Sequence, residues 1–293
     1  MKKQLKVLYR IAVSITALLL VLPLTSCDTT EYPKETTQTQ SSDETTDDTQ
    51  AVTPSDTTTD TPAPAIPDKL RFGSYNIKHG ADADLDMSKL AKNILATDLD
   101  IVGFQEVDQR TTRVNNIDTM KRLSNHTGYK YYAFFKAMDY KGGEYGVGVL
   151  SKYPIVETER IPLYSGNKEP RVLGRAEINV NGLTVNFFVT HLSYESLEIR
   201  TQQFKQIAEK VKGYESFIIT GDFNTSDFNE FSVIENSATV NNSDFSIPTF
   251  PGGTSAIDNI VYEDGTWSFS RPWTFIASYS DHYLLYAEAE LLK

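Results

Sequence analysis

The sequence predicts an α/β fold in which two mixed β-sheets pack against each other and helices cover their outer faces. Three observations lead to this prediction. Short apolar runs rich in β-branched and aromatic residues recur throughout residues 69–293. Runs with helical periodicity separate some of these strands, and short turns separate others. A mixture of crossovers and hairpins predicts sheets that contain both parallel and antiparallel pairs.

Composition divides the 293 residues into three segments, of which residues 1–27 have the pattern of a secretion signal. Basic residues up to Arg10 precede an uncharged apolar run, residues 11–22, that is short for a membrane span. The segment ends in small residues followed by Cys27, the single cysteine of the chain. This ending resembles a bacterial lipobox, which implies that Cys27 is diacylated and becomes the mature N-terminus. A plain secretory signal with an incidental cysteine is the alternative.

Residues 28–68 predict a disordered, acidic, Thr-rich tether. They contain thirteen Thr, five Pro and ten Asp or Glu against one Lys, with almost no large apolar side chains. Such a segment cannot bury enough surface to offset the entropy of ordering it. Charge repulsion and proline keep it extended, so we expect it to hold the folded part away from a membrane.

We expect residues 69–293 to form one catalytic domain, because they contain no internal repeat and no second linker. The domain has no disulfides, because it contains no cysteine. The net charge of −11 is +4 in residues 1–27 and −9 in residues 28–68, which leaves −6 for the domain. An acidic domain argues weakly against tight, non-specific nucleic-acid binding, which depends largely on Lys and Arg. It excludes no substrate, since a metal ion can reverse the local charge.

The strands and helices of the domain follow from periodicity and from turn residues. The predicted strands are residues 70–77, 101–104, 129–135, 146–151, 172–180, 184–190, 217–220, 257–262 and 283–291. The predicted helices are residues 87–96, 119–127 and 195–212, the last with Leu197, Phe204, Ile207, Ala208 and Val211 on one apolar face. Short turns at residues 180–182 and 152–154 predict antiparallel pairing of the strands beside them.

Polar side chains that could bind a metal or move a proton stand at the ends of these strands. They are Asn76, Glu106, Glu144 with Tyr145, His191, Asp222 with Asn224, Asp258, and Asp281 with His282. Each has an ordinary explanation when taken singly, as a turn residue, a cap, a solvated carboxylate or a structural histidine. Asp222 and Asn224 have one residue between them, so in an extended backbone both would point to the same side.

Taken in order, the motifs YNIKHG, GFQEVD, YGVGVLSKYPI, VTHL, ITGDFNTS, AIDNIVY and SYSDHYLL resemble the endonuclease/exonuclease/phosphatase superfamily. This superfamily includes deoxyribonucleases, abasic-site endonucleases, inositol polyphosphate 5-phosphatases and bacterial sphingomyelinases. The resemblance covers about residues 69–293, and GDFN and SDH are its most specific parts. It implies a four-layer α/β sandwich, in agreement with the two sheets expected from the strand pattern.

The resemblance also implies a role for each polar strand end. It places the metal on Glu106, with Asn76 and Asp281 near it, and Mg²⁺ fits these oxygen donors, with Mn²⁺ or Ca²⁺ as alternatives. Asp222 and Asn224 position the attacking water and contact the phosphate. His191 and His282 lie beside the scissile phosphate, and Asp258 orients His282. Tyr145 and Arg171 are candidate substrate contacts. The register at Glu144 and Tyr145 stays open. Lys168 is a further candidate phosphate contact, and the alternative for Lys168 and Arg171 is that both are solvated loop charges.

The sequence therefore predicts a metal-dependent hydrolase of phosphoester bonds, most simply of phosphodiesters. We expect it on the outer side of a bacterial membrane, held by a lipid at Cys27, as a monomer without an obligate protein partner. The alternatives are an extracellular nuclease acting on DNA or RNA and a non-catalytic binding lipoprotein with the same fold. The strand pattern does not identify the phosphoester.

Overall fold

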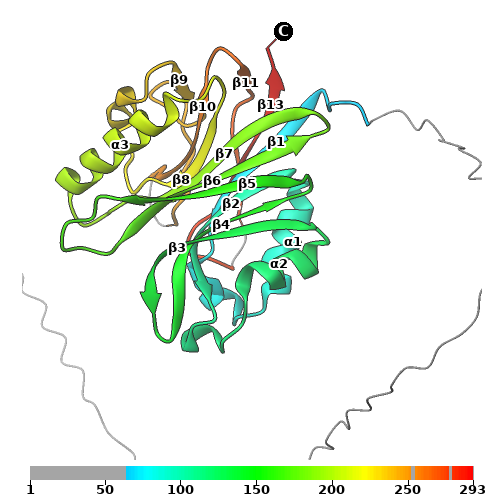
Figure 1. Cartoon of the computed structure of the whole chain (residues 1–293), viewed down its shortest axis with the longest axis vertical. Coiled ribbons are helices and arrows are strands. Elements are labelled where there is room, and N and C mark those ends of the chain that lie inside the picture. Colours follow the sequence, from blue (N-terminus) through cyan, green and yellow to red (C-terminus); the bar gives the residue numbers. More distant parts are fainter. Residues whose placement is uncertain (1–63, 252–254, 277–278, 293) are drawn as a thin grey trace, which may run out of the picture. The chain divides into compact units, whose positions relative to one another are not determined.

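The computed structural model describes residues 64–251, 255–276 and 279–292, so the predicted signal, Cys27 and most of the predicted tether lie outside the described residues. Two mixed β-sheets form the centre of the described chain (Figure 1). Helix α3 (Leu197–Val211) covers one side of the pair, and helices α1 (Met87–Thr97) and α2 (Thr119–Thr127) cover the other. The predicted sandwich of two mixed sheets with helices outside is confirmed. No described helix is long and apolar enough to cross a membrane.

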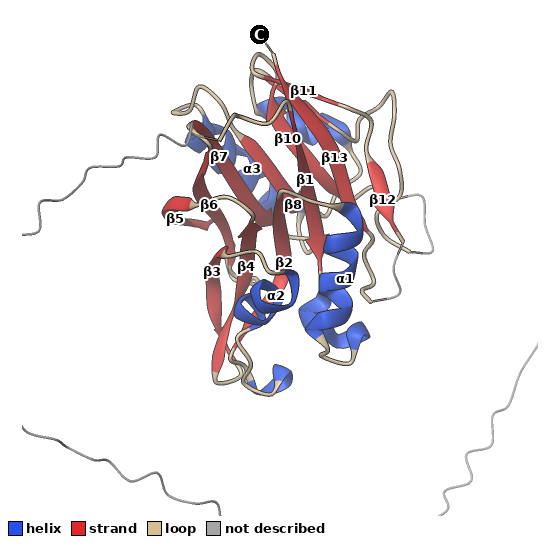
Figure 2. Ribbon diagram, turned by 90° about the vertical axis from the view of Figure 1, so that its right-hand side faces the viewer, coloured by secondary structure: helices blue, strands red, loops and turns tan. Residues whose placement is uncertain are grey.

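The first sheet follows the order β11-β13-β1-β2-β4-β3, and β12 also pairs with β13. Its strands are β1 (Lys69–Asn76), β2 (Ile101–Gln109), β3 (Tyr131–Tyr140), β4 (Gly143–Ser151), β11 (Trp267–Phe269), β12 (Trp273–Phe275) and β13 (Leu284–Leu291). Strands β1 and β2 are parallel, and the other pairs are antiparallel. Figure 2 shows α1 and α2 lying over the outer face of this sheet.

The second sheet follows the order β5-β6-β7-β8-β10-β9. Its strands are β5 (Ile155–Leu163), β6 (Arg171–Val180), β7 (Leu183–His191), β8 (Ile218–Asp222), β9 (Ser237–Thr239) and β10 (Asp258–Glu263). Here β7 and β8 are the parallel pair, and α3 forms the crossover between them. Three short 3-10 helices, Lys78–Ala83, Thr112–Val114 and Phe228–Val233, complete the described elements.

Three apolar clusters hold these layers together. One lies between the sheets and contains Phe72 and Phe187, whose rings stack 6.1 Å apart. A second joins the first sheet to α1 and α2, and a third joins the second sheet to α3 through Phe204 and Phe223. Because apolar area removed from water is the main favourable term in folding, this arrangement fixes the two sheets face to face. Their adjoining edges can then supply side chains to one site.

The ends of the elements follow from local chemistry. The side chains of Asp86, Asp118 and Ser196 cap the three α-helices by accepting the backbone N–H of Ser88, Lys121 and Ile199. In the β6–β7 hairpin, Val180 pairs with Leu183 across a two-residue loop. That loop requires positive φ at both residues, which Asn181 (55°) and Gly182 (100°) provide.

Two sequence expectations are wrong. Residues 152–154 do not close an antiparallel hairpin, because β4 belongs to the first sheet and β5 to the second, so this turn carries the chain between the sheets. Leu197 is 61% exposed and does not share the apolar face of α3, whereas Phe204, Ile207, Ala208 and Val211 are buried. Leu197 is the first residue of the helix.

Candidate active site

The predicted site residues meet at one edge of the sandwich because of strand direction. Asn76 and His191 are the last residues of β1 and β7, the first strands of the two parallel pairs. Asp222 ends β8, and its antiparallel neighbour β10 begins at Asp258, which is directly opposite it in the register. By the same logic Arg171 begins β6 beside the end of β7, and His282 precedes β13 beside the end of β1. The carboxyl ends of the parallel strands therefore define the site.

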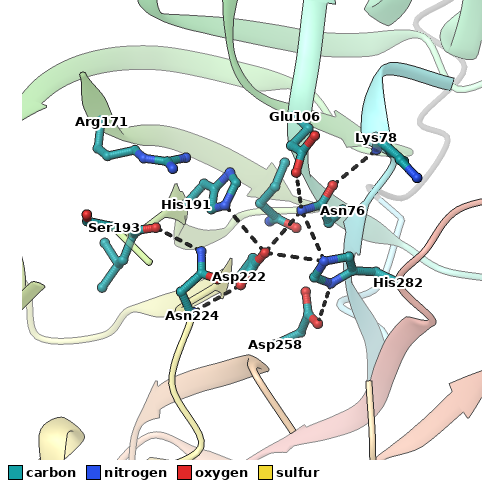
Figure 3. Close-up of polar contacts among 12 residues, drawn as sticks. Asn76, Lys78, Glu106, Arg171, His191, Ser193, Asp222, Asn224, Asp258 and His282 are labelled. Atoms are coloured by element: carbon teal, nitrogen blue, oxygen red, sulfur yellow. Dashed lines mark hydrogen bonds and ion pairs between the residues drawn. The ribbon is translucent and has the colours of Figure 1, made fainter. Parts of the chain in front are cut away.

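Asn76 connects the two sheets at the base of the site (Figure 3). Its buried Nδ2 donates to Glu106 Oε1 over 3.1 Å and to Asp222 Oδ2 over 3.0 Å, and it lies 3.5 Å from His282 Nε2. The Asn76 Oδ1 atom accepts the backbone N–H of Lys78 over 3.1 Å. A neutral amide is the only group that can donate to two neighbouring carboxylates here without adding charge. Asn76 thus holds Glu106 beside Asp222 and His282.

Glu106 reaches the site through an irregularity in β2. The register with β4 shifts between Phe104 and Val107, so that two residues of β2 face one residue of β4. Glu106 itself has φ of 54°, which is uncommon for a residue with a side chain. A β-bulge of this kind redirects a side chain next to functional sites. Burial raises the pKa of Glu106, the hydrogen bond from Asn76 opposes the rise, and the carboxylate of Asp281 adds to it.

His282 is held between two buried carboxylates. Its Nδ1 lies 2.9 Å from Asp258 Oδ2, and its Nε2 lies 3.6 Å from Asp222 Oδ2. Burial alone would lower the pKa of His282, but the charge and hydrogen bond of Asp258, together with Asp222, raise it to about 10. The imidazole is therefore protonated at neutral pH. Burial and the charge of Asp258 raise the pKa of Asp222 to about 7, although His282 opposes the rise.

His191 has the opposite character. Its Nε2 lies 3.4 Å from Asp222 Oδ2, while its buried Nδ1 has no hydrogen-bond partner in the described chain. Burial, then the positive charges of Arg171 and His282, hold the pKa of His191 well below its usual range. The site thus contains one neutral and one protonated imidazole, both in contact with the same carboxylate. Environments that separate the pKa values of neighbouring groups are typical of acid–base sites.

Asn224 lies at the site for a different reason from the one expected. The extended geometry predicted for Asp222 and Asn224 is wrong, because β8 ends at Asp222 and Asn224 has φ of 53°. Asp222 Oδ1 accepts the backbone N–H of Asn224 over 3.0 Å, which closes a tight turn. The Asn224 amide then donates to the backbone oxygen of Leu192 over 2.9 Å.

A cleft of about 590 Å³ opens over these residues. Of the predicted residues, eight line it directly: Glu106, Tyr145, Arg171, His191, Asp222, Asn224, Asp281 and His282. Asn76 and Asp258 lie beneath, in contact with the lining residues. Tyr145 is in the wall, whereas its neighbour Glu144 pairs with Lys136 over 3.2 Å. Arg171 also faces the cleft, and Lys168 is not among its lining residues.

Sequence reasoning missed several residues of the cleft wall. These are Arg113, Met138, Tyr140, Glu169, Tyr194, Phe250 and Ile257. Arg113 stacks over the ring of Tyr140 at 4.7 Å and pairs with the buried Asp108, so its position depends on tertiary contacts between distant segments. Tyr194 follows His191 by three residues, and that closeness to a predicted site residue was the only sequence signal available.

The donor set fits a divalent cation. Glu106 and Asp281 face the same cleft, the charge of Asp281 raises the pKa of Glu106, and the buried Oδ1 of Asp281 has no hydrogen-bond partner in the described chain. A bound cation would relieve the repulsion and satisfy that oxygen. Asp222, Asp258 and His282 also form a buried cluster with ligand atoms within 4.8 Å. Protonation of His282 disfavours metal binding to its nitrogen, so Glu106 and Asp281 are the better ligands.

The fold, and a site built on polar strand ends, define a class of phosphoester-cleaving proteins. The chain belongs to the Endonuclease/Exonuclease/phosphatase family, which it matches over residues 73–282, and this family depends on divalent metals. No protein with a curated description matches the chain significantly.

Solved structures with the same fold have diverged far in sequence. An endonuclease/exonuclease/phosphatase from Beutenbergia cavernae is 21% identical with a TM-score of 0.65, covering 77% of this chain and 72% of that one. The mannosyl-6-phosphatase of Bacteroides thetaiotaomicron is 18% identical, with a TM-score of 0.59 and coverages of 76% and 100%. The human Nocturnin catalytic domain with bound sulfate is 20% identical, with a TM-score of 0.60 and coverages of 76% and 94%. These similarities show the fold.

Proposed function

We propose that the protein is a divalent-metal-dependent hydrolase of phosphodiesters, with Mg²⁺ as its metal. The observation that carries this proposal is the position of Asn76, which brings Glu106 within hydrogen-bonding distance of the same amide that contacts Asp222 and His282. A metal carboxylate and two imidazoles thus lie around one cleft. Hydrolysis of a phosphodiester requires positive charge, an oriented water and stabilisation of the leaving oxygen.

Each of these requirements has a candidate group. Glu106 and Asp281, with Asn76 close by, would hold the cation, which supplies positive charge to the phosphate oxygens when it is bound. Asp222 contacts both imidazoles and its backbone turn places Asn224 beside it, so these two residues orient the attacking water and Asp222 accepts its proton. The protonated His282, oriented by Asp258, donates its proton to the leaving oxygen, and the neutral His191 hydrogen-bonds to the phosphate. Arg171 and Tyr145 complete the contacts to the substrate.

One panel tests this function. The purified full-length protein is assayed on duplex DNA, RNA, sphingomyelin, phosphoinositides and bis(4-nitrophenyl) phosphate, each with Mg²⁺ and with a chelator. We expect Mg²⁺-dependent hydrolysis of at least one diester and none with His282→Ala. Binding of a phosphoester without hydrolysis, unaffected by the chelator, would instead favour a binding lipoprotein. Replacing Mg²⁺ by Mn²⁺ or Ca²⁺ in the same assay identifies the metal.

A nuclease is the second candidate within this reaction class. Two exposed aromatic residues favour it, because Tyr194 (69% exposed) and Phe250 (37% exposed) line the cleft beside the two histidines. Exposed rings next to a phosphate site are suited to stacking against bases. The negative charge of the domain argues against it. If DNA or RNA is hydrolysed faster than the other esters of the panel, the protein is a nuclease.

We further propose that the protein is a lipoprotein held at the outer side of a bacterial membrane through Cys27, and that it acts there as a monomer. The sequence of residues 1–27 and the acidic segment that follows support this proposal. Metabolic labelling with a fatty-acid analogue should label the wild-type protein, and Cys27→Ala should remove the label and release the protein from membranes. Labelling that persists in Cys27→Ala would contradict it.

A further inference from the structure

Arg171 is a buried arginine whose guanidinium faces the cleft. Its side chain is 3% exposed, and Nε and Nη1 have no hydrogen-bond partner in the described chain. In Figure 3 the guanidinium points toward His191 at the centre of the site. A buried cation with unused N–H groups is unfavourable unless an anion approaches it. Arg171 is therefore prepared to bind an anionic group inside the cleft.

A carboxylate of the protein already lies beside this guanidinium. Glu169 Oε1 is 3.1 Å from Arg171 Nη1, in an ion pair that lacks hydrogen-bond geometry. The Glu169 side chain is 33% exposed and lines the same cleft as Arg171 and His191. A phosphate bound to Arg171 would consequently have the negative charge of Glu169 as a neighbour.

The loop between β5 and β6 holds Glu169 in this place. The backbone N–H of Lys168 donates to the backbone oxygen of Ser165 over 2.9 Å, and the backbone N–H of Arg171 donates to the side-chain Oγ of Ser165 over 3.0 Å. Pro170 restricts Glu169, the residue before it, to extended conformations. Glu169 thus meets Arg171 because the loop is closed around Ser165, and its position is built into the fold.

Two other ion pairs have members that line the cleft. Arg113 donates from Nε and Nη2 to the buried carboxylate of Asp108 over 2.8 and 2.7 Å. Asp281 pairs with Lys78 over 3.1 Å. The Arg171–Glu169 pair differs from the Arg113–Asp108 pair, because its guanidinium has unused N–H groups and its carboxylate is partly open to solvent.

We propose that Glu169 shares the Arg171 guanidinium with the substrate phosphate and thereby makes the cleft selective for monoanionic phosphodiesters over dianionic phosphomonoesters. This inference rests on the proposed function and names its substrate class. A diester has one negative charge, whereas a monoester has nearly two above its second pKa of about 6. The second charge would be repelled by Glu169, and partial exposure of this residue limits the effect to about tenfold.

The variant Glu169→Gln tests the proposal, because it removes the charge and keeps the shape. In the full-length protein at pH 8, kcat/KM is measured for bis(4-nitrophenyl) phosphate and for 4-nitrophenyl phosphate. We expect the diester-to-monoester ratio of kcat/KM to fall about tenfold in the variant, mainly through a lower KM for the monoester. Glu198→Gln is the matched control, since Glu198 lies in the first turn of α3 and does not line the cleft.

A binding measurement separates failure of this inference from failure of the proposed function. Calorimetry at pH 8 compares inorganic phosphate, a dianion, with dimethyl phosphate, a monoanion. Glu169→Gln should bind phosphate about tenfold more tightly and dimethyl phosphate with little change, even if no ester is hydrolysed. The proposal would be overturned if Glu169→Gln left both ratios unchanged: the diester-to-monoester ratio of kcat/KM and the ratio of the affinities for phosphate and dimethyl phosphate. An equal loss of activity on both esters would also overturn it, because Glu169 would then only position Arg171.

Discussion

Asn76 and Asp222, 146 residues apart in the sequence, are joined by a hydrogen bond of 3.0 Å between side chains from different sheets. The same Asn76 nitrogen contacts Glu106, so the expected metal carboxylate and the expected water-positioning carboxylate share one donor. The arrangement of the candidate site therefore depends on how the sheets pack as well as on which residues are present. The predictions below test this dependence.

Asp222→Asn should strongly reduce hydrolysis and stabilise the fold. Loss of an acid–base group lowers kcat by about a thousandfold. The pKa of Asp222 is raised to about 7 in the folded chain. Its charge therefore begins to destabilise the fold once the pH exceeds the pKa of Asp222 in the unfolded chain, and this cost is complete above pH 7. The variant should melt at a higher temperature than wild type at pH 8 in the presence of a chelator.

The control for that experiment is Asp118→Asn, which changes an aspartate that caps α2 outside the cleft. It should keep full activity and lose a little stability. If Asp222→Asn instead melts at a lower temperature than wild type, the charge of Asp222 stabilises the fold, and the destabilising effect assigned to it here is wrong.

Glu106→Gln should remove metal binding. In wild type, Mg²⁺ at a hundred times its Kd should stabilise the folded state by about 2.7 kcal/mol, and the variant should lose most of this gain together with its activity. Thermal denaturation with Mg²⁺ and with a chelator measures this stabilisation in wild type and in the variant. Glu144→Gln is the matched variant, because Glu144 pairs with Lys136 away from the cleft, and it should respond to Mg²⁺ as wild type does.

The raised pKa of His282 predicts a decline in stability at alkaline pH. Its pKa is about 10 in the folded state against 6.5 for the free group, so its stabilising charge is complete below pH 6.5 and is lost as the pH rises through 10. Between pH 8 and 9.5, wild type in chelator should lose about 5 °C in Tm. His282→Gln should show a clearly smaller loss, and equal slopes for the two proteins would contradict the protonated state assigned to this histidine.

Gly103→Ala should weaken the packing between the sheets. A Cβ at Gly103 would collide with Thr220 Oγ1 and would come within 2.9 Å of Val189 Cγ2, both from the second sheet. Overpacking of this kind costs about 1–3 kcal/mol, measurable by urea denaturation, and it should also reduce activity by moving Glu106 relative to Asp222. Gly213→Ala is the comparison, since its nearest neighbour would be at 3.7 Å, and near-wild-type behaviour of Gly103→Ala would refute the coupling.

The sequence was sufficient to predict the class of fold and to name residues that meet at one edge of it. Strand ends are visible as short apolar runs followed by polar residues such as His191 and Asp222, and strand direction then brings them together. Strand β5 was not found, because its charged residues and Pro162 are typical of an exposed edge strand and resemble a loop. The passage of the chain between sheets after β4 was missed because a short turn is compatible with either connection.

The finer geometry of the site could not be read from the sequence. The cleft contacts of Glu169 and Arg113 depend on side-chain partners, and Asn224 lies in a turn whose left-handed backbone looks like a continued strand in one-letter code. Residue type and spacing indicate which groups can act. Burial and neighbouring charge, which decide that His282 is protonated and His191 is not, arise only in the folded chain.

The position of Glu106, the proposed cation ligand, depends on the number of residues in the irregular part of β2. Two residues of β2 stand opposite one residue of β4, so a chain shorter by one residue at this point could pair regularly, and Glu106 would then face the opposite side of its sheet. Insertions and deletions here are consequently more damaging to activity than most amino-acid exchanges. A designer who wanted an inert scaffold could obtain one by removing Gln105 alone.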